Sequence, residues 1–298
     1  MSIAPGVATL AAPADPADGG GGGAGMAISP RDFAAIAAIM QRDARIALSE
    51  AKTTLVESRL ARRLRTFGLT RFSDYVALVE RDADERHAMV VALTTNHTLF
   101  FREPHHFTHF EEVLLPRLRQ KQGPVRIWSA GCSSGEEVYT IAMCLLGRDR
   151  AAAGWLRDRD VRLLATDIAP PVVEAVRNAC YADHATKGVP EPWRSLWMQP
   201  TADGGAMVMD ERARALVTAN VLNLFDPWPL KAAYDAIFCR NVMIYFDDQA
   251  KEELQLRLID QLVPGGLLYI GHSERLLGAA ARAMESCGHT IYRKPERA

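Results

Sequence analysis

From residue 124 onward, strand-like and helix-like segments alternate along the chain. Short apolar runs such as "PVRIWSAG" (124–131) and "YDAIFCRN" (234–241) are typical of buried strands, and "DDQAKEELQLRLIDQL" (247–262) is typical of an amphipathic helix. Strands that alternate with helices form a parallel sheet with helices on both faces. The sequence therefore predicts an α/β fold with a doubly wound, mostly parallel sheet.

Other stretches depart from this alternation. Within the α/β domain, predicted for residues 124–298, the segment 182–213 is rich in Pro, Trp and Gly, and we expect a small inserted subdomain there. Residues 29–95 show apolar positions at helical spacing, which predicts a small all-helical N-terminal domain. Residues 96–123 link the two domains. Residues 1–28 contain a five-glycine run, and we expect a disordered tail.

Composition and charge argue against several functional classes. The net charge of −1 indicates no broad basic surface for nucleic acid or for membranes. The N-terminal stretch lacks the basic and apolar runs of a signal peptide or anchor, so we expect no direct membrane insertion. Five cysteines without a C-x-x-C motif are typical of small buried residues in a reducing compartment. We therefore predict a cytoplasmic protein without disulfides.

Acidic residues follow the first two predicted strands, where open α/β sheets bind their ligands. The turn "AGCSSGEE" (130–137) lacks the glycine patterns of phosphate sites, and Glu136 and Glu137 would repel a phosphate. Alternatively, these acids only complement a helix dipole, an explanation that suits Glu136 better than Glu137. Asp167 is placed to hydrogen-bond a ribose. Because Pro170 follows shortly after, Asp167 also suits a helix N-cap, and the two roles are compatible.

Polar pairs follow the third and fourth predicted strands. Asn223 precedes Leu224, and Arg240 precedes Asn241. Packing alone does not explain polar side chains at successive strand ends. Together these features favour S-adenosylmethionine as the cofactor. They comprise an acid for a ribose, a glycine turn for a methionine-like chain, the lack of a phosphate site, and an acid for the positive charge of the ligand.

Several segments resemble the chemotaxis-receptor methyltransferases, the CheR family. They are "TTNHTLFFREPHHF", "IWSAGCSSGEE", "ATDI", "YDAIFCRNVMIYF" and "LLYIGHSE". The resemblance implies the fold of S-adenosylmethionine-dependent methyltransferases. It also implies methylation of specific glutamate side chains on chemoreceptors (methyl-accepting chemotaxis proteins), which yields glutamate methyl esters and S-adenosylhomocysteine for sensory adaptation. One departure is Val138, where the family usually has proline, and segment 182–213 matches poorly.

The resemblance also implies roles for individual residues. Arg102 and Tyr245 would stand beside the transferred methyl group as catalytic residues. Segment 94–107 would be a wall of the active site, with Phe100 and Phe101 packing it onto the sheet domain. The alternative is a buried interdomain hinge with Arg102 in a structural salt bridge. The residues implied to contact the cofactor are Asn96, Thr98, Arg102, Glu137, Asp167, Asn223, Leu224, Arg240 and Asn241.

A basic stripe marks the helical domain. Spacings of seven and four residues place Lys52, Arg59 and Arg63 on one face of a predicted helix. Such a stripe is most often a solvated face, but it also suits an acidic receptor helix, and we assign Lys52, Arg59, Arg62 and Arg63 to substrate binding. Charge reversal at Arg59 and Arg63 would then weaken methylation and leave cofactor affinity unchanged. Nucleic acid fits poorly, because no aromatic residues are interleaved.

A histidine cluster follows Arg102. His105 and His109 have the i, i+4 spacing of some metal ligands, with His106 between them, but no H-E-x-x-H motif is present. We therefore predict no metal site.

Two other functions are compatible with these residues. One is a methyltransferase with a different acceptor, and the other is a non-catalytic regulator that senses S-adenosylmethionine. The presence of both Arg102 and Tyr245 argues against a pure sensor. Nothing in the sequence demands more than a monomer.

Overall fold

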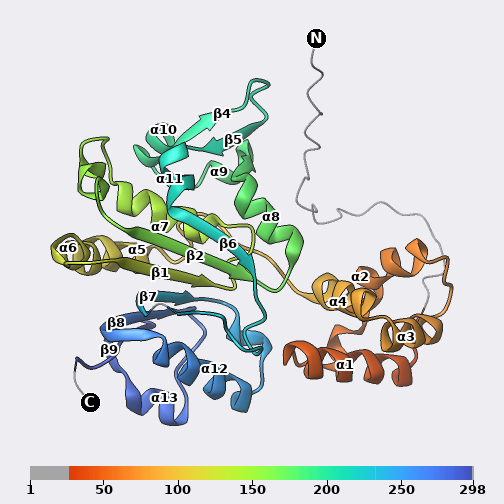
Figure 1. The fold of residues 1–298 in the computed structure, drawn as a ribbon. Helices are drawn as coiled ribbons and strands as arrows, with labels where there is room; N and C mark the ends of the chain where they lie inside the picture. Colours follow the sequence, from red (N-terminus) through yellow and green to blue (C-terminus); the bar gives the residue numbers. More distant parts are fainter. Residues whose placement is uncertain (1–26, 232, 297–298) are drawn as a thin grey trace.

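The computed structural model of the protein describes residues 27–231 and 233–296 (Figure 1). The tail predicted for residues 1–28 lies outside the described residues except for its last two. Ile28 contradicts that prediction, because its side chain is buried in the apolar core. Its backbone N–H also donates to Glu57 Oε1 (2.8 Å). The ordered chain therefore includes residues just before the first helix.

The N-terminal part is all helical and forms a separate unit in Figure 1. Helix α2 is amphipathic, and its apolar residues Val56, Leu60 and Leu64 are fully buried. None of the helices in the described part of the chain is long and apolar enough to cross a membrane. The elements of this helical unit are α1 (Pro30–Ala44), the 3-10 turn η1 (Glu50–Lys52), α2 (Thr53–Thr66), α3 (Phe72–Arg81) and α4 (Ala83–Leu93).

A seven-stranded sheet forms the centre of the second part, in the order β6-β2-β1-β7-β8-β10-β9. The first five strands in this order pair in parallel, and β10 and β9 join the edge antiparallel. This arrangement confirms the predicted doubly wound, mostly parallel sheet. The strands are β1 (Val125–Ala130), β2 (Val161–Asp167), β6 (Val217–Val221), β7 (Tyr234–Cys239), β8 (Leu262–Ile270), β9 (Glu285–Gly288) and β10 (Ile291–Arg293).

Helices cover both faces of the sheet, and strand β7 shows why. All six of its residues are buried, which requires a cover on each face. Ala236 and Phe238 belong to one apolar cluster, whereas Ile237 and Cys239 belong to the other. The first cluster contains residues of α7 (Glu136–Leu146), α8 (Pro170–Asn178) and α11 (Glu211–Leu216). The second contains residues of α12 (Asp248–Asp260) and α13 (Gly278–Ala283).

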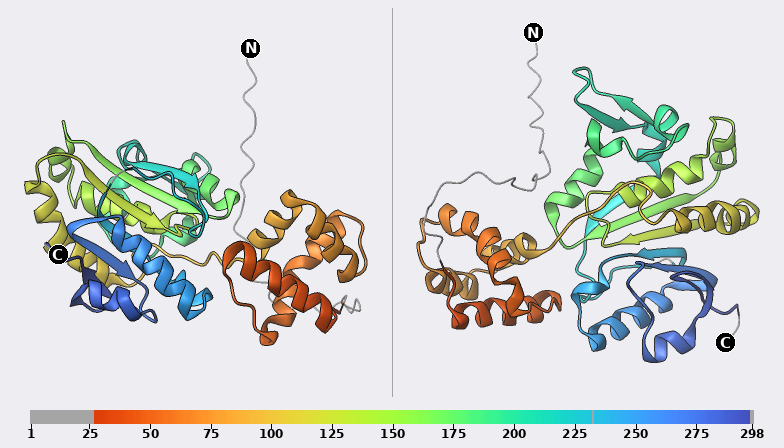
Figure 2. Two further views of the ribbon diagram at one scale, coloured as in Figure 1. Left: turned by 60° about the horizontal axis from the view of Figure 1, so that its bottom comes forward. Right: turned by 180° about the vertical axis from the view of Figure 1, so that it is seen from behind.

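The helical unit shares the second cluster with the sheet. Ile36 and Leu60 belong to the same cluster as Leu258 of α12. Polar contacts join the two parts as well, because Ala47 N–H donates to the Tyr245 carbonyl (3.0 Å). Figure 2 shows the helical unit beside the sheet at the end from which α12 starts. This packing leaves the carboxyl ends of the central strands facing the helical unit.

The interruption predicted for residues 182–213 is a small antiparallel sheet that stands apart from the main one (Figure 1). Its strand order is β3-β5-β4. The excursion begins slightly earlier than predicted, because Cys180 already pairs with Val208. Its elements are β3 (Cys180–Ala182), α9 (Asp183–Thr186), α10 (Trp193–Trp197), β4 (Met198–Pro200) and β5 (Ala206–Met209).

The connection predicted for residues 96–123 is extended only over its first part. It then forms α5 (Pro104–His109), the π-helical turn η2 (Phe110–Leu114) and α6 (Leu115–Gln120). Phe107, Phe110 and Leu118 bury their side chains in the first cluster. Most of this segment is therefore part of the sheet domain's cover.

The packing of α12 predicts a stability effect. Leu254 is fully buried in the second cluster, so Leu254→Ala should lower the free energy of unfolding by about 2–5 kcal/mol. Glu253→Ala on the exposed side of the same helix should change it by less than about 0.5 kcal/mol. Urea unfolding of both variants measures the difference, and similar values for the two would contradict this packing.

Candidate active site

A cavity lies between the helical unit and the carboxyl ends of β1, β2 and β7. It brings together residues that are far apart in the sequence, from Lys52 of η1 to Phe246 beyond β7. All residues predicted for the cofactor or for catalysis line it: Asn96, Thr98, Arg102, Glu137, Asp167, Asn223, Leu224, Arg240, Asn241 and Tyr245.

The turn after β1 forms the floor of the cavity. Gly131 has a positive φ (77°), and a Cβ atom added there would collide with the Val242 side chain. The N–H groups of Gly131 and Cys132 both donate to the Thr166 carbonyl (2.8 and 2.9 Å). Glycine is therefore needed at this turn for its conformation and for the close approach of a neighbouring loop.

Asp167 ends β2 and holds the adjoining turns. Its carboxylate accepts from Ser133 N–H (2.9 Å) and from Ala169 N–H (3.0 Å). Burial raises the pKa of Asp167, although these backbone hydrogen bonds act in the opposite direction. The N-cap of α8 is Ala169, so Asp167 supports the approach to that helix and also lines the cavity.

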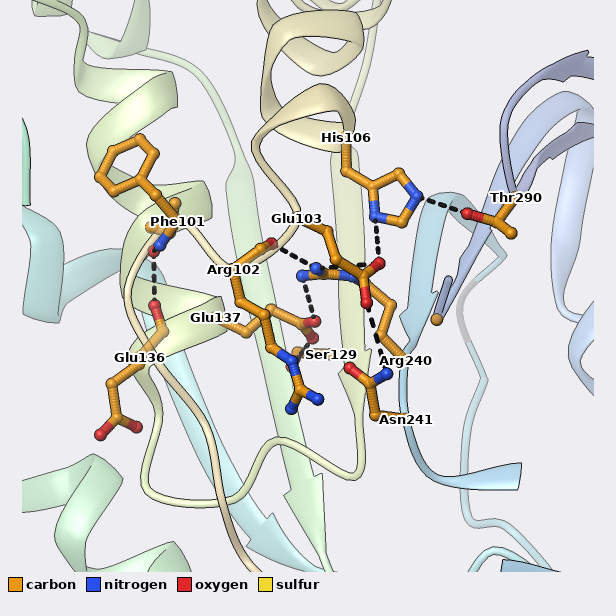
Figure 3. Close-up of polar contacts among 12 residues, drawn as sticks. Phe101, Arg102, Glu103, His106, Ser129, Glu136, Glu137, Arg240, Asn241 and Thr290 are labelled. Carbon is orange, nitrogen blue, oxygen red and sulfur yellow. Dashed lines mark hydrogen bonds and ion pairs between the residues drawn. The ribbon is translucent and has the colours of Figure 1, made fainter. Parts of the chain in front are cut away.

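Glu137 and Arg240 form an ion pair beneath the cavity (Figure 3). Glu137 accepts from Ser129 Oγ (2.6 Å) and from Arg240 Nη1 (3.0 Å). Arg240 also lies 3.3 Å from Glu103 Oε2, measured from Nη2. Glu137 therefore lines the cavity with its carboxylate already paired to Arg240, and the Arg240 guanidinium lies between two carboxylates.

Glu136 does not belong to the cavity. Its side chain is buried and accepts from Ser134 Oγ (2.7 Å), and Figure 3 shows it turned away from Arg102. Burial raises the pKa of Glu136. Of the two explanations offered for this acid, the structure favours a role in the first turn of α7.

Glu274 is a residue that the sequence analysis missed. It follows β8, and its buried carboxylate accepts from the N–H groups of Gly271 (2.6 Å), Asn241 (3.1 Å) and Ile244 (3.2 Å). Burial raises the pKa of Glu274, against the effect of these bonds. It therefore holds the loop that carries Asn241 and Tyr245. An acid just after an apolar strand was the available signal, as it was for Asp167.

The segment that carries Asn96 and Arg102 is held from both sides. On the sheet side, Ser133 Oγ donates to the Asn96 carbonyl (2.8 Å), and Phe101 N–H donates to Thr140 Oγ1 (3.2 Å). Arg102 Nη1 donates to the His97 carbonyl (3.0 Å). Within the described ranges Arg102 forms no ion pair, so the structural salt bridge offered as the alternative is absent there.

From the helical side, Arg59 fixes the start of this segment. Its guanidinium donates to the carbonyls of Leu93 (3.0 Å) and Thr94 (2.8 Å) and to Thr95 Oγ1 (3.0 Å). Three bonds to consecutive residues leave this side chain little freedom to meet a partner. The assignment of Arg59 to substrate binding stays a prediction, and its side chain also holds the start of this segment.

Arg63 is also occupied. It forms an ion pair with the buried Glu85, with Nε 2.9 Å from Oε1, and Tyr75 donates to the same carboxylate (2.6 Å). Arg62 is exposed, and Lys52 lines the cavity near the Tyr245 ring (5.8 Å). Arg59 and Arg63 of the predicted stripe are thus bonded within the protein. Arg62 faces outward, and Lys52 faces the cavity.

Asn223 connects the two parts of the molecule. Its Nδ2 donates to the Asp43 carbonyl in α1 (2.9 Å), and its Oδ1 accepts from Phe225 N–H (3.0 Å). Both ends of the amide already have protein partners, which was not expected for a cofactor contact. Its neighbour Leu224 is buried at the cavity wall.

The histidine cluster belongs to the same network. Possible ligand atoms of Glu103, His105 and His106 lie within 4.8 Å of one another, whereas His109 bonds Tyr269 (3.0 Å). Burial and then the charge of Arg240 lower the pKa of His106 to about 3. Because Glu103 already pairs with Arg240, a metal ion would have to compete with that cation, and we assign none.

Family models match the chain in two adjoining parts. The model described as "CheR methyltransferase, all-alpha domain" matches residues 31–94. The model described as "CheR methyltransferase, SAM binding domain" matches residues 96–292.

Relatives match over most of the chain. It is 42% identical to a probable chemotaxis protein methyltransferase of Rhizobium etli, over 84% of this chain and 95% of the relative. It is 39% identical to chemotaxis protein methyltransferase 2 of Pseudomonas aeruginosa, over 88% and 92%. It is 37% identical to a chemotaxis protein methyltransferase of Escherichia coli, over 90% and 92%.

The bonds of Arg59 predict an effect on the cavity. Arg59→Leu should weaken binding of S-adenosylhomocysteine about tenfold, because the segment that leads to Asn96 loses three hydrogen bonds. Titration calorimetry measures the affinity. Arg62→Leu, an exposed position on the same helix, is the matched control and should bind normally. Normal affinity in the Arg59 variant would favour the original assignment of this side chain to substrate docking alone.

Proposed function

The chain belongs to the CheR methyltransferase family, and we propose that it transfers methyl groups from S-adenosylmethionine to glutamate side chains of chemoreceptors. It is an S-adenosylmethionine-dependent methyltransferase. The products are a glutamate methyl ester and S-adenosylhomocysteine. The observation that carries the proposal is that one cavity contains both Arg102 and Tyr245 together with the acidic strand ends.

The residues of the cavity fit this cofactor. Asp167 lies at the end of β2, where an acid can hydrogen-bond a ribose. Leu224 and Val242 provide apolar surface, and the turn at Gly131 lets the backbone approach a ligand closely. Glu103 and Glu137 pair with the guanidinium of Arg240. This buried cation therefore does not face a cationic ligand as an unpaired positive charge.

We assign contacts to the cofactor in two groups. Asn96, Thr98 and Arg102 would contact it from the segment that closes the cavity. Asp167, Leu224 and Asn241 would contact it from the strand ends. Glu137, Asn223 and Arg240 also line the cavity and complete the proposed set. Their side chains are bonded within the protein as well, as are those of Asp167 and Asn241.

The bound cofactor supplies a methyl group that its sulfonium already activates. A carboxylate oxygen of the acceptor forms the bond to the methyl carbon as the carbon–sulfur bond breaks, and the bonding pair stays on sulfur. A glutamate has a reference pKa of about 4.3 and is ionised at neutral pH, so no general base is required. The task of the protein is to align the reacting atoms and exclude water.

Arg102 and Tyr245 are the proposed catalytic residues. Burying a carboxylate is costly unless it is paired, and Arg102 faces the cavity with a guanidinium free of carboxylate partners among the residues described. Its planar fork suits a carboxylate of the acceptor or of the cofactor. Tyr245 lies at the cavity beside Lys52, where its hydroxyl can donate a hydrogen bond that orients one acceptor oxygen.

Receptor docking is proposed on the outward cations of the helical unit. Lys52 lies at the cavity, and Arg62 is exposed on α2, so a helix with acidic residues can bind there with a glutamate directed inward. Arg59 and Arg63 would support this surface from within. An acceptor on the cytoplasmic helices of a receptor would also place the enzyme in the cytoplasm. We propose that it acts there as a monomer.

The alternative functions are less well supported. A regulator that only senses S-adenosylmethionine has no need of Arg102 and Tyr245 in the same cavity. A methyltransferase with another acceptor would not require the outward cations beside that cavity. The relatives are named chemotaxis protein methyltransferases, and the match covers most of their length. This supports the receptor as acceptor.

Substitution of the two proposed catalytic residues should separate their roles. Arg102→Ala should lower kcat by about 10²–10³, because a positioned charged donor is lost. Tyr245→Phe should lower kcat about tenfold with unchanged affinity for S-adenosylhomocysteine, because only one hydrogen bond is removed. Tyr292→Phe in the edge strand β10 is the matched control. Normal kcat in either variant would remove that residue from the catalytic role.

The proposed reaction is tested by labelled methyl transfer from S-adenosylmethionine to receptor-containing membranes. We expect label that alkali releases as methanol, which is characteristic of a carboxyl methyl ester. Membranes from a strain without receptors are the control. Alkali-stable label would indicate a different acceptor group, and no label from an enzyme that binds S-adenosylhomocysteine would favour the sensor.

A further inference from the structure

The backbone around Arg102 has an unusual conformation. Phe101 and Glu103, the residues on either side, both have left-handed φ angles (53° and 57°). Side chains other than glycine rarely adopt this region, and they do so when their surroundings compensate the strain. The turn 101–103 therefore needs external support to present Arg102 to the cavity.

That support comes largely from the Glu103 carboxylate, whose exposed fraction is 9%. One oxygen accepts from His272 N–H (3.2 Å), His272 Nδ1 (2.9 Å) and Asn241 Nδ2 (3.3 Å). The other lies 3.3 Å from Arg240 Nη2 and 3.4 Å from His106 Nδ1. One carboxylate thus connects the turn to the loops after β7 and β8 and to α5 (Figure 3).

The main chain of the turn is fixed by the same group of residues. Arg240 donates to the carbonyl of Arg102, and Phe101 N–H donates to Thr140 Oγ1 in α7 (3.2 Å). The backbone before and after Arg102 is therefore anchored, and its side chain projects toward the cavity. Glu103 holds the guanidinium of Arg240 in place, and Arg240 in turn fixes the main chain at Arg102.

We propose that Glu103 is a positioning residue: it anchors the turn 101–103 to the ends of β7 and β8 and so holds Arg102 where cofactor and acceptor meet. This inference rests on the proposed role of Arg102 in the reaction. Glu103 itself is turned toward the protein and is not among the residues that line the cavity. It acts through Arg102, and its bond to the Asn241 amide (3.3 Å) ties the turn to the loop after β7.

A double-mutant cycle on cofactor affinity tests the proposal. Calorimetric titration with S-adenosylhomocysteine compares the wild type with Arg102→Ala, Glu103→Gln and the double variant. Glu103→Gln should weaken binding about tenfold, because a charged partner of Arg240 is lost. On the Arg102→Ala background the same change should cost less than about twofold, since the side chain that it positions is already gone.

Steady-state kinetics provide a readout that a general loss of structure would not give. Glu103→Gln should lower kcat while the KM for receptor stays unchanged, because Arg62, the exposed docking cation on α2, does not line the cavity that Arg102 faces. The matched control is Glu285→Gln, which removes a carboxylate from the exposed ion pair with Arg293 (2.7 Å). It should leave binding and kcat unchanged.

A milder variant covers the case in which Glu103→Gln does not fold. His272 is 61% exposed and donates to Glu103 from its backbone N–H and from Nδ1. His272→Ala removes only the Nδ1 bond, so it loosens the carboxylate without leaving a buried charge unpaired. It should weaken binding less than Glu103→Gln does, and this effect should also vanish on the Arg102→Ala background.

The outcomes are distinguishable. Additive losses in both cycles, or normal affinity in the Glu103 and His272 variants, would overturn the positioning role and leave the methyltransferase assignment intact. A wild-type protein that fails to bind S-adenosylhomocysteine would instead overturn the proposed site, and the positioning role with it.

Discussion

The buried guanidinium of Arg240 is the interaction on which the active-site geometry depends. Its side chain is only 2% exposed, and it lies between Glu103 and Glu137. A buried charge is tolerated only when it is paired and hydrogen-bonded, so β7, α7 and the segment before α5 must meet at this point. Burial alone would raise the pKa of Glu103, but the hydrogen bond from His272 and the charge of Arg240 lower it to about 2. Glu103 therefore stays ionised at neutral pH.

The same network determines which charges a ligand meets in the cavity. The carboxylates of Glu103 and Glu137 pair with Arg240, so this buried cation does not oppose a sulfonium ligand as an unpaired charge. Arg102 belongs to the same turn as Glu103, yet it is left without a carboxylate partner in the described part of the chain. Arg240 is thus paired within the protein, whereas Arg102 is available for the reaction. The difference between them comes from which side chain the turn directs inward.

Much of the site could be predicted because strand ends converge by necessity. Asp167 and Asn241 follow buried strands of a parallel sheet, so their meeting follows from the fold class. The glycine turn after the first strand was also identified, because a close turn needs the conformational freedom of glycine. The intramolecular bonds of Arg59 and Arg63 could not be predicted, because helical spacing shows which face a cation shares but not whether an acceptor lies opposite. Glu85 and the carbonyl of Thr94 decide that, and neither is near in sequence.

The sequence by itself determined the alternation of strands and helices, the amphipathic faces of the helical unit and the family to which the chain belongs. These features are local, since they depend on spacing and on short motifs. Only the tertiary structure decided which polar groups pair: Arg240 with Glu103 and Glu137, Asn223 with the backbone of α1, and Arg59 with the start of the closing segment. These pairings depend on distances between residues that are remote along the chain. For Arg240 burial makes the pairing obligatory, because an unpaired buried charge is too costly.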